Sequence, residues 1–281
     1  GNVSAEQTFR AASQVLQLTG LSVSLGKGVT VPQKRLSDAA HIHGEDGMGN
    51  LSQTLPRATH SFADAPFSDT LLMELLQQYP HEITLVAIAP LNNLAATEQN
   101  SPGILRLAKE LVIMGGAFQT PGNVTPCAEF NMAFYPEAAE IVFASREDIV
   151  ILPLDVTRQL VLTEDILQSI TQVNPTHPLA QLITTLGDFL ITTSRRYRET
   201  DGKKGFLVHD AVAIAYLFYP ELLQFQRARV QVETQGKHTF GQTFIDGRHS
   251  PKLTANGWVA SSVNARGLFA CLSEDLKTSL Q

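Results

Sequence analysis

The sequence has few of the residues that define several protein classes. Cysteine occurs only twice in 281 residues, at Cys127 and Cys271, so a disulfide framework is excluded and a reducing, cytoplasmic setting is expected. No apolar run approaches the roughly 18 residues of a membrane-spanning helix, which argues against a membrane protein. Only 17% of the residues are charged, which argues against a disordered chain or a coiled coil. The 27 Asp and Glu residues outnumber the 21 Lys and Arg residues, and the net charge of −6 argues against a nucleic-acid partner.

Hydrophobic residues make up 43% of the sequence, and they fall into short runs separated by segments with helical spacing. The runs at residues 83–89, 111–114 and 149–154 predict strands buried on both faces. Helices are predicted at residues 4–18, 68–79, 93–98, 104–110, 136–145, 162–170, 179–194 and 210–219, and shorter strands at 21–25 and 227–234. This alternation predicts an α/β fold, in which an open, mostly parallel sheet is covered by helices on both faces. We expect one domain over residues 1–281.

Polar residues or glycines follow each of the three buried runs, at residues 92–93 (NN), 115–116 (GG) and 155–157 (DVT). Ligands of open parallel sheets bind outside the carboxyl ends of the strands, so we expect the functional site at these residues. The glycine pair lacks the third, spaced glycine of a dinucleotide-binding loop, which disfavours an oxidoreductase on a similar sheet.

The most informative loop runs from residue 114 to residue 131 and carries Asn123, Glu129 and Asn131. Their amide and carboxylate groups suit a polyhydroxyl ligand, because each sugar hydroxyl both donates and accepts hydrogen bonds. Glu129 and Asn131 are two residues apart, so an extended segment would point both to one side. The alternative is structural: Asn123 is a turn residue, and Glu129 and Asn131 cap the next helix.

Three further segments carry candidate chemistry. His209 and Asp210 open a helix, where a histidine could protonate a leaving group and an aspartate could bind a hard metal ion, or the pair could simply cap the helix. Residues 41–47 (HIHGEDG) place two histidines two apart, which is weak evidence for a transition metal beside an ordinary turn. Residues 1–4 (GNVS) precede a helix and contain capping residues.

Taken together and in this order, these segments resemble the nucleoside hydrolases, the inosine-uridine-preferring N-ribosylhydrolases. The resemblance covers essentially the whole chain, and it is greatest to bacterial members of broad specificity. It is carried by residues 1–4 (GNVS), 43–44 (HG), 85–95 (LVAIAPLNNLA), 114–131, 154–157 (LDVT), 208–210 (VHD) and 232–236 (VETQG).

The resemblance implies an enzyme that hydrolyses the N-glycosidic bond of purine and pyrimidine ribonucleosides with the help of Ca²⁺. It implies that His209 and His43 are catalytic on the base side, and that Asp210 and the carbonyl of Ile88 bind the metal ion. The implied substrate-binding residues are Asn2, Met114, Asn123, Glu129, Phe130, Asn131 and Tyr197. A homodimer or homotetramer is also expected.

One family feature is missing from this sequence. Family members carry an aspartate cluster, D-x-D-x-G-x-D-D, one strand-helix unit upstream of GNVS, and this sequence begins at GNVS. The expected fold therefore lacks the first strand and helix, and the expected affinity for Ca²⁺ is weak or absent because a hard dication usually takes 6–8 oxygen ligands. In the alternative interpretation, the protein is a defective, truncated paralogue that binds ribosides or has only a structural role. An in-frame aspartate cluster in the upstream coding DNA would favour the enzyme.

Overall fold

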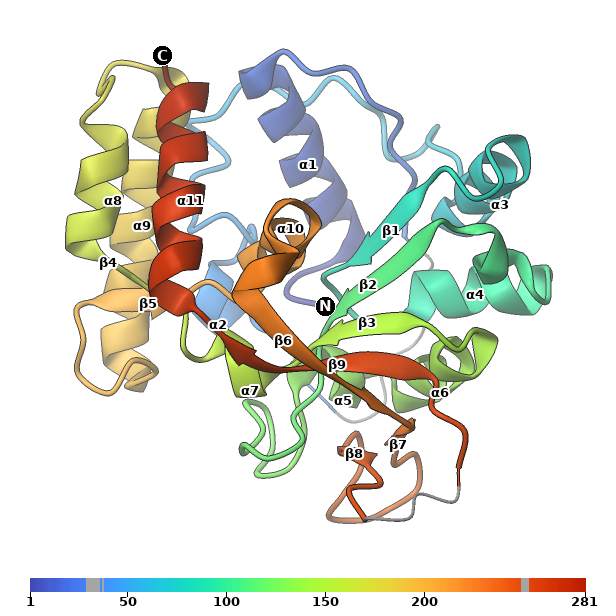
Figure 1. Ribbon diagram of the computed structural model, residues 1–281. Coiled ribbons are helices and arrows are strands. Elements are labelled where there is room, and N and C mark those ends of the chain that lie inside the picture. The colour runs from blue at the N-terminus through green and yellow to red at the C-terminus, as the bar shows by residue number, and fades with distance from the viewer. Residues whose placement is uncertain (29–35, 37, 249–252) are drawn as a thin grey trace.

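A computed structural model describes residues 1–28, 36, 38–248 and 253–281. Its centre is a five-stranded sheet in the order β1-β2-β3-β9-β6 (Figure 1). Strands β1, β2, β3 and β9 run parallel, and β6 is antiparallel to β9. These strands are β1 (Thr84–Ala87), β2 (Glu110–Met114), β3 (Ile149–Leu152), β6 (Leu223–Ala228) and β9 (Gly257–Val263). The expected open, mostly parallel sheet is confirmed.

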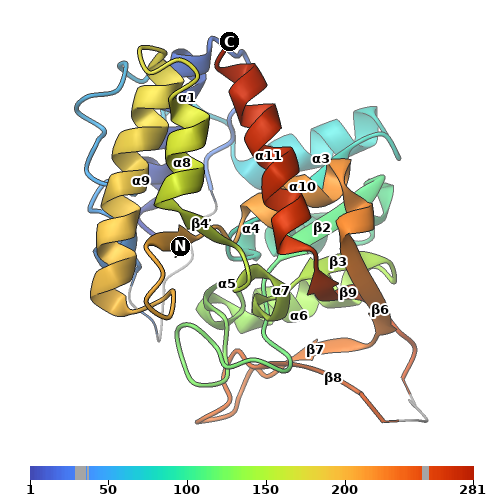
Figure 2. The same cartoon turned by 60° about the vertical axis from the view of Figure 1, so that its left-hand side comes forward.

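Helices cover both faces of this sheet (Figures 1 and 2). Leu111 and Ile113 of β2 belong to a core that contains residues of α3 (Ser68–Gln78), α4 (Asn92–Asn100) and α6 (Pro136–Ser145). Val112 and Met114 belong to a second core with residues of α10 (Ala211–Phe218) and α11 (Ala265–Ser279). Alternate residues of one strand therefore serve opposite cores, as the continuous apolar run predicts.

The remaining elements are divided among the cores: η1, α5 and β7 contribute to the first, α7 to the second, and α8 and α9 to a smaller third. Figure 2 shows α8, α9 and α11 standing beside one another, with α1 behind them. These elements are α1 (Ala5–Thr19), α2 (Ala40–His43), η1 (Ile104–Leu107), α5 (Phe130–Phe134), α7 (Leu154–Thr157), β4 (Val161–Thr163), α8 (Glu164–Thr171), α9 (Pro178–Tyr197), β5 (Gly205–Leu207), η2 (Pro220–Leu222), β7 (Val230–Val232) and β8 (Thr243–Ile245). No helix among the described residues is long and apolar enough to cross a bilayer.

Several predicted elements need correction. Residues 21–25 form no strand, and four of these five residues are exposed, so no sheet or core holds them. The helix predicted at 104–110 is a short 3₁₀ turn followed by the start of β2, because Glu110 pairs with β1. Residues 161–163 form β4, which pairs with β5 before α8 begins. The strand predicted at 227–234 is divided between the end of β6 and β7, and the sequence patterns predict none of β5, β8, β9 and α11.

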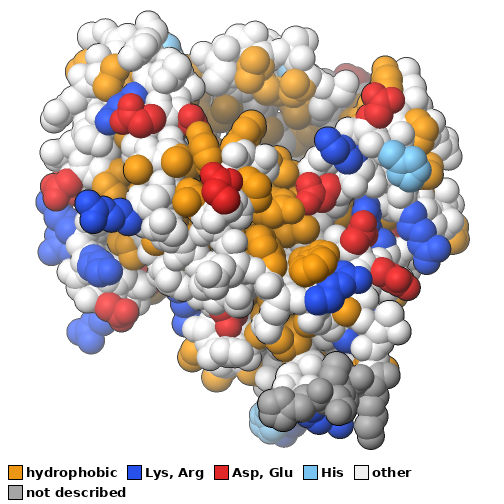
Figure 3. Space-filling model, in the orientation of Figure 1, with side chains coloured by type: hydrophobic (Ala, Val, Ile, Leu, Met, Phe, Trp, Pro, Cys, Tyr) orange, Lys and Arg blue, Asp and Glu red, His pale blue; other side chains and the backbone are white. Residues whose placement is uncertain are grey.

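Strand β1, the first of the three strands predicted to be buried, is not buried on both faces. Within the described residues it pairs only with β2, and Leu85 is its only buried residue. Ile88, just after it, is 44% exposed. On the face shown in Figure 3, hydrophobic side chains gather over α10 and the neighbouring strands. Helix α10 contributes exposed apolar side chains there, of which Phe218 is 68% exposed.

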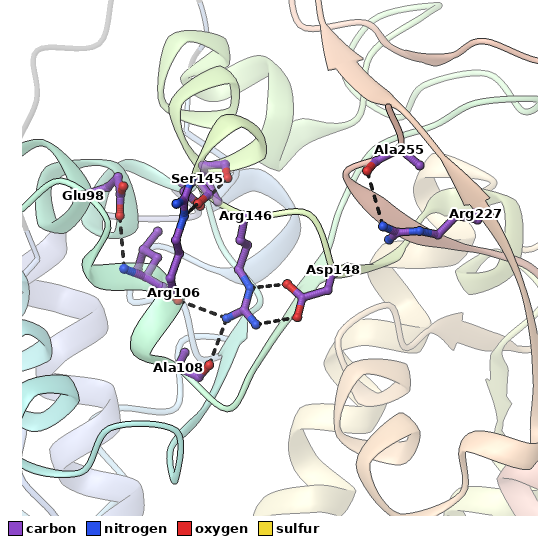
Figure 4. Close-up of polar contacts among 10 residues, drawn as sticks. Glu98, Arg106, Ala108, Ser145, Arg146, Asp148, Arg227 and Ala255 are labelled. Atoms are coloured by element: carbon purple, nitrogen blue, oxygen red, sulfur yellow. Dashed lines mark hydrogen bonds and ion pairs between the residues drawn. The ribbon is translucent and has the colours of Figure 1, made fainter. Parts of the chain in front are cut away.

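The amino ends of β2 and β3 are joined by Arg146, which follows α6 (Figure 4). Its guanidinium donates to the carbonyls of Leu105 at 3.0 Å and Ala108 at 3.2 Å, and it makes two bonds to Asp148 at 2.6 and 2.8 Å. Arg146 is 7% exposed, and its bonds to the two carbonyls are buried, whereas its partner Asp148 reaches solvent. This network lies at the opposite end of the sheet from the strand ends where a ligand is expected.

Replacing Arg146 with methionine should lower the free energy of unfolding by about 2–4 kcal/mol, because two buried carbonyls lose their donor. The matched control is Arg10→Met, which removes an exposed ion pair to Glu6 and should cost less than about 1 kcal/mol. Urea unfolding of both variants measures the difference. Equal losses for the two variants would show that the Arg146 network does not stabilise the fold.

Candidate functional site

Glu129 lies near the carboxyl end of β2 and organises the loop that follows this strand. It is the N-cap of α5, and its Oε1 accepts a hydrogen bond from Asn131 N at 2.9 Å. Its Oε2 accepts from Met132 N at 3.2 Å and from Gly116 N at 3.1 Å. A Cβ on Gly115 would lie 2.4 Å from Met132 Cε and 3.2 Å from Glu129 Oε2, so the glycine turn packs closely against both side chains. The extended segment predicted for residues 129–131 is wrong, and the capping alternative holds for Glu129.

The Glu129 carboxyl is 2% exposed. Burial raises its pKa to about 7, although the three backbone N–H bonds act to lower it. The charge of Asp210 contributes to the same increase, which places these two acidic side chains within electrostatic reach of each other. At neutral pH the group is therefore near its titration midpoint.

The two predicted asparagines lie on either side of this carboxyl. Asn131 is 7% exposed and donates from Nδ2 to the carbonyl of Met114 at 3.2 Å, which ties α5 to the end of β2. Asn123 is exposed, and its Oδ1 accepts from Phe130 N at 2.9 Å. Asn123 therefore holds the start of α5, while Met114 is buried beneath the site.

His209 approaches the same region from the segment before α10. Its Nδ1 shares a hydrogen bond of 2.7 Å with the hydroxyl of Thr157, at the end of α7. Burial lowers the pKa of His209 to about 4, and the charges of Arg158 and His43 contribute. Its imidazole is therefore neutral at pH 7.

Asp210 occupies the N-cap position of α10, but its side chain makes no capping bond. The capping alternative therefore does not explain this carboxyl. Surrounding protein atoms raise its pKa to about 6, although the residue keeps contact with solvent. Its charge contributes to the raised pKa of Glu129.

The base-side candidates His43 and Tyr197 come from α2 and α9. Burial, with a smaller effect of His41, lowers the pKa of His43. The charge of His43 makes a small contribution to the lowered pKa of His209. Tyr197 is 42% exposed, and its ring packs edge-on against His41 at 5.4 Å between centroids. His41 was not predicted as a site residue, although the spacing of the two histidines marked this turn.

The loop that carries His43 is organised by Asp46. The carboxylate of Asp46 accepts from the backbone amides of Met48, Asn50 and Ser52, each at 2.8 Å. Burial raises the pKa of Asp46, but these hydrogen bonds outweigh it and the net pKa is lowered. The turn interpretation of this segment is therefore confirmed, and Asp46 is a loop anchor.

Asp46→Asn should lower the free energy of unfolding by about 1–2 kcal/mol at pH 7, because one accepting oxygen is lost. A lowered pKa stabilises the folded state above the ordinary value of 3.8, and this stability is lost as the pH falls through the folded value. The deficit of the variant should therefore shrink below pH 3.8. Thermal melts at several pH values measure it against the exposed control Asp64→Asn, and a pH-independent deficit would contradict the assignment.

Asn2 and Phe130 lie at the mouth of this region, near the end of β1. The carbonyl of Asn2 accepts from Ala39 N at 3.0 Å, which fixes the segment before α1 to the His43 turn. Gly1 lies against Pro90 and the ring of Phe130. Ser4 and Gln7 form a capping box, which confirms the capping interpretation of residues 1–4. Contact of Asn2, Met114, Asn123 or Phe130 with a substrate stays a prediction.

The metal ligands implied by the resemblance do not make a calcium site by themselves. Ile88 borders a hollow of about 260 Å³ beside β1 and offers one backbone carbonyl. Asp210 offers one carboxylate, and the described part of the chain contains no group of three or more His, Cys, Asp or Glu side chains placed to hold a metal. Ca²⁺ takes 6–8 oxygen ligands, so these two donors do not fit it and we derive no chemical step through a metal ion.

Asp155 of α7 and Arg158, its C-cap, support the loop; Asp155 was predicted only as part of the polar segment 155–157, and Arg158 was not predicted. Asp155 accepts from Phe118 N at 3.0 Å and from Gln119 N at 2.7 Å. Arg158 donates to the carbonyl of Gly122 at 2.8 Å. The polar segment directly after the third apolar run predicts where the site lies. It does not predict that Asp155 and Arg158 bind backbone groups of the loop after β2.

Comparisons with known proteins agree with this arrangement. The family of inosine-uridine preferring nucleoside hydrolases matches residues 1–270. The non-specific ribonucleoside hydrolase RihC of Salmonella heidelberg (strain SL476) is 37% identical over 283 aligned positions, covering 96% of this chain and 87% of the relative. A purine-preferring ribonucleoside hydrolase from Gardnerella vaginalis superposes with a TM-score of 0.89 and 26% identity over 100% of this chain and 88% of that one. The plant nucleoside hydrolase PpNRh1 gives a TM-score of 0.87 and 27% identity over 99% and 88% of the two chains. The chain therefore belongs to the inosine-uridine preferring nucleoside hydrolase family.

Proposed function

We propose that this protein hydrolyses the N-glycosidic bond of ribonucleosides to ribose and free base. The observation that carries the proposal is that His209 bonds to Thr157 just after β3, and Glu129 accepts from Gly116 just after β2, so both residues lie at the carboxyl ends of neighbouring parallel strands. Family membership over almost the whole chain supports the same reaction.

The proposed chemistry follows from the charges of the site. The bond between C1′ and the base nitrogen breaks with its electron pair on the base, so positive charge develops on the ribose, as in other glycoside hydrolyses. The carboxylate of Asp210 stabilises this charge. The neutral imidazole of His209 donates a hydrogen bond to the departing base. Water supplies hydroxide to C1′ and, overall, a proton to the base.

The second candidate function is riboside binding without turnover. It is favoured by one observation: the described part of the chain has no cluster of carboxylates from which a metal or a water-activating base could be built. Titration calorimetry with inosine, run beside a turnover assay, separates the two functions. Binding without release of base would support this candidate.

We also propose broad base specificity. If both His43 and His209 act on the base side, two imidazole donors can serve purine and pyrimidine leaving groups, whose protonation sites differ. The protein expressed from its complete reading frame should therefore hydrolyse uridine, cytidine, inosine and adenosine. Release of each base is measured by chromatography. Activity confined to one class of base would contradict the breadth, and no activity on any of the four would contradict hydrolysis itself.

We also propose that the protein forms a homodimer or a homotetramer. The exposed apolar side chains of α10, including Ile214 at 45% and Phe218 at 68% exposure, are of the kind that an interface covers. Sedimentation velocity of the purified protein distinguishes a monomer from these assemblies.

A further inference from the structure

A buried hydroxyl, that of Thr157 in the turn after β3, contacts His209. Thr157 is fully buried, and its Oγ1 lies 2.7 Å from Nδ1 of His209. Its backbone is fixed independently of this contact: its amide donates to the carbonyl of Pro153 at 3.1 Å, and its carbonyl accepts from Leu160 N at 3.1 Å. The hydroxyl is thus held rigidly at one ring nitrogen.

The direction of this hydrogen bond decides which nitrogen of His209 carries the proton. Within the described chain, the bond to His209 is the only one that the Thr157 hydroxyl makes. If the hydroxyl accepted from Nδ1, its own hydrogen would be buried without an acceptor, which is costly. If it donates to Nδ1, its hydrogen is satisfied and the ring proton lies on Nε2.

We propose that Thr157 is a positioning residue that keeps the proton of His209 on Nε2, so that the ring presents an N–H donor to the leaving base. The inference deepens the proposed hydrolysis and rests on it for the identity of the acceptor. Thr157 does not touch the substrate in this account. It selects the tautomer and the ring orientation, in the way that second partners orient other functional histidines.

The position of Thr157 in the fold explains why this contact is possible. Residues 154–157 form the single turn α7 directly after β3, and Leu154 and Val156 of this turn are fully buried. Packing of these two side chains in the second core fixes the turn. The hydroxyl therefore projects from a rigid element at the strand end, as precise positioning requires.

The first test compares Thr157→Val with Thr157→Ser. Valine keeps the shape and loses the hydrogen bond, so kcat for inosine and uridine should fall about 10- to 100-fold while KM stays within about twofold. Serine keeps the hydroxyl and should keep most of the activity. A riboside of p-nitrophenol, whose leaving group needs no protonation, should be cleaved by Thr157→Val at a nearly unchanged rate.

The matched control is Thr171→Val, which removes a buried hydroxyl bonded only to its own helix at Leu167. It should leave both substrates unaffected. If Thr157→Val slows the p-nitrophenyl riboside as much as inosine, or if serine fails to rescue, the positioning role is overturned.

The second test does not depend on turnover. Nitrogen NMR of protein labelled in its histidine rings reports which nitrogen of His209 is protonated in the free wild-type protein. We expect an unprotonated Nδ1 and a protonated Nε2, with the preference weakened in Thr157→Val. A proton on Nδ1, or an unchanged preference in the variant, would overturn the proposal, and this holds even if the protein hydrolyses no ribonucleoside.

Discussion

His209→Ala should lower kcat for ribonucleoside hydrolysis by about 10²- to 10⁴-fold, with little change in KM. The reason is that the leaving base loses its hydrogen-bond donor in the transition state, where negative charge builds on the base. His209→Gln keeps an N–H donor and should recover part of the loss.

The matched control for this variant is His60→Ala. His60 also shares a ring-nitrogen bond with a hydroxyl, that of Ser13 at 2.9 Å, but its partner belongs to α1 and not to a segment that follows a strand of the sheet. Steady-state kinetics on inosine and uridine should leave His60→Ala close to wild type. A normal kcat for His209→Ala would remove His209 from the mechanism.

Glu129→Ala should lower the free energy of unfolding by about 3–6 kcal/mol, since three backbone N–H groups lose a buried acceptor at about 1–2 kcal/mol each. Such a loss is large for a protein of ordinary stability. Chemical unfolding measures it, with Glu137→Ala on the exposed surface of α6 as the control. A loss below about 1 kcal/mol would show that the loop does not depend on this carboxyl.

Glu129→Gln separates the structural role of this residue from a role in binding ribose. The pKa of Glu129 is raised, so its protonation stabilises the fold at low pH, and that stability is lost as the pH rises from the ordinary 4.5 through about 7. Glutamine does not titrate, so the deficit of the variant should be smaller at pH 8 than at pH 5. Kinetics measured on folded protein should show kcat falling more than KM rises if Glu129 also acts on the ribose. Normal kinetics with a lowered melting temperature would confine it to the loop.

The sequence predicts most of the layers of this fold, because apolar runs and helical spacing can be recognised within short segments of the chain. The apolar runs of β2 and β3 predict strands that are buried on both faces, and their residues are buried. Gly20, with φ of 68°, ends α1 close to the predicted end of that helix. Strand β9 was missed because Trp258 and two serines interrupt its apolar pattern, and only pairing with β3 and β6 makes it a strand. Strand β1 has the composition of a central strand, but burial depends on neighbours and not on composition.

The location of the candidate site follows from the sequence, but the bonds between its residues do not. Strand ends follow from the parallel topology, so the polar residues after each strand could be placed together. The contact between Thr157 and His209 joins residues 52 positions apart, and no local pattern encodes it. The extended segment assumed around Glu129 failed because three backbone donors converge on this side chain and start a helix there.

Hydrolysis in ¹⁸O-labelled water tests the central claim most directly. The protein from its complete reading frame is incubated with inosine, and the ribose and base are separated and analysed by mass spectrometry. We expect equal amounts of hypoxanthine and ribose, with the label in the ribose and none in the base. Bound inosine that remains intact, or ribose released without the label, would contradict it.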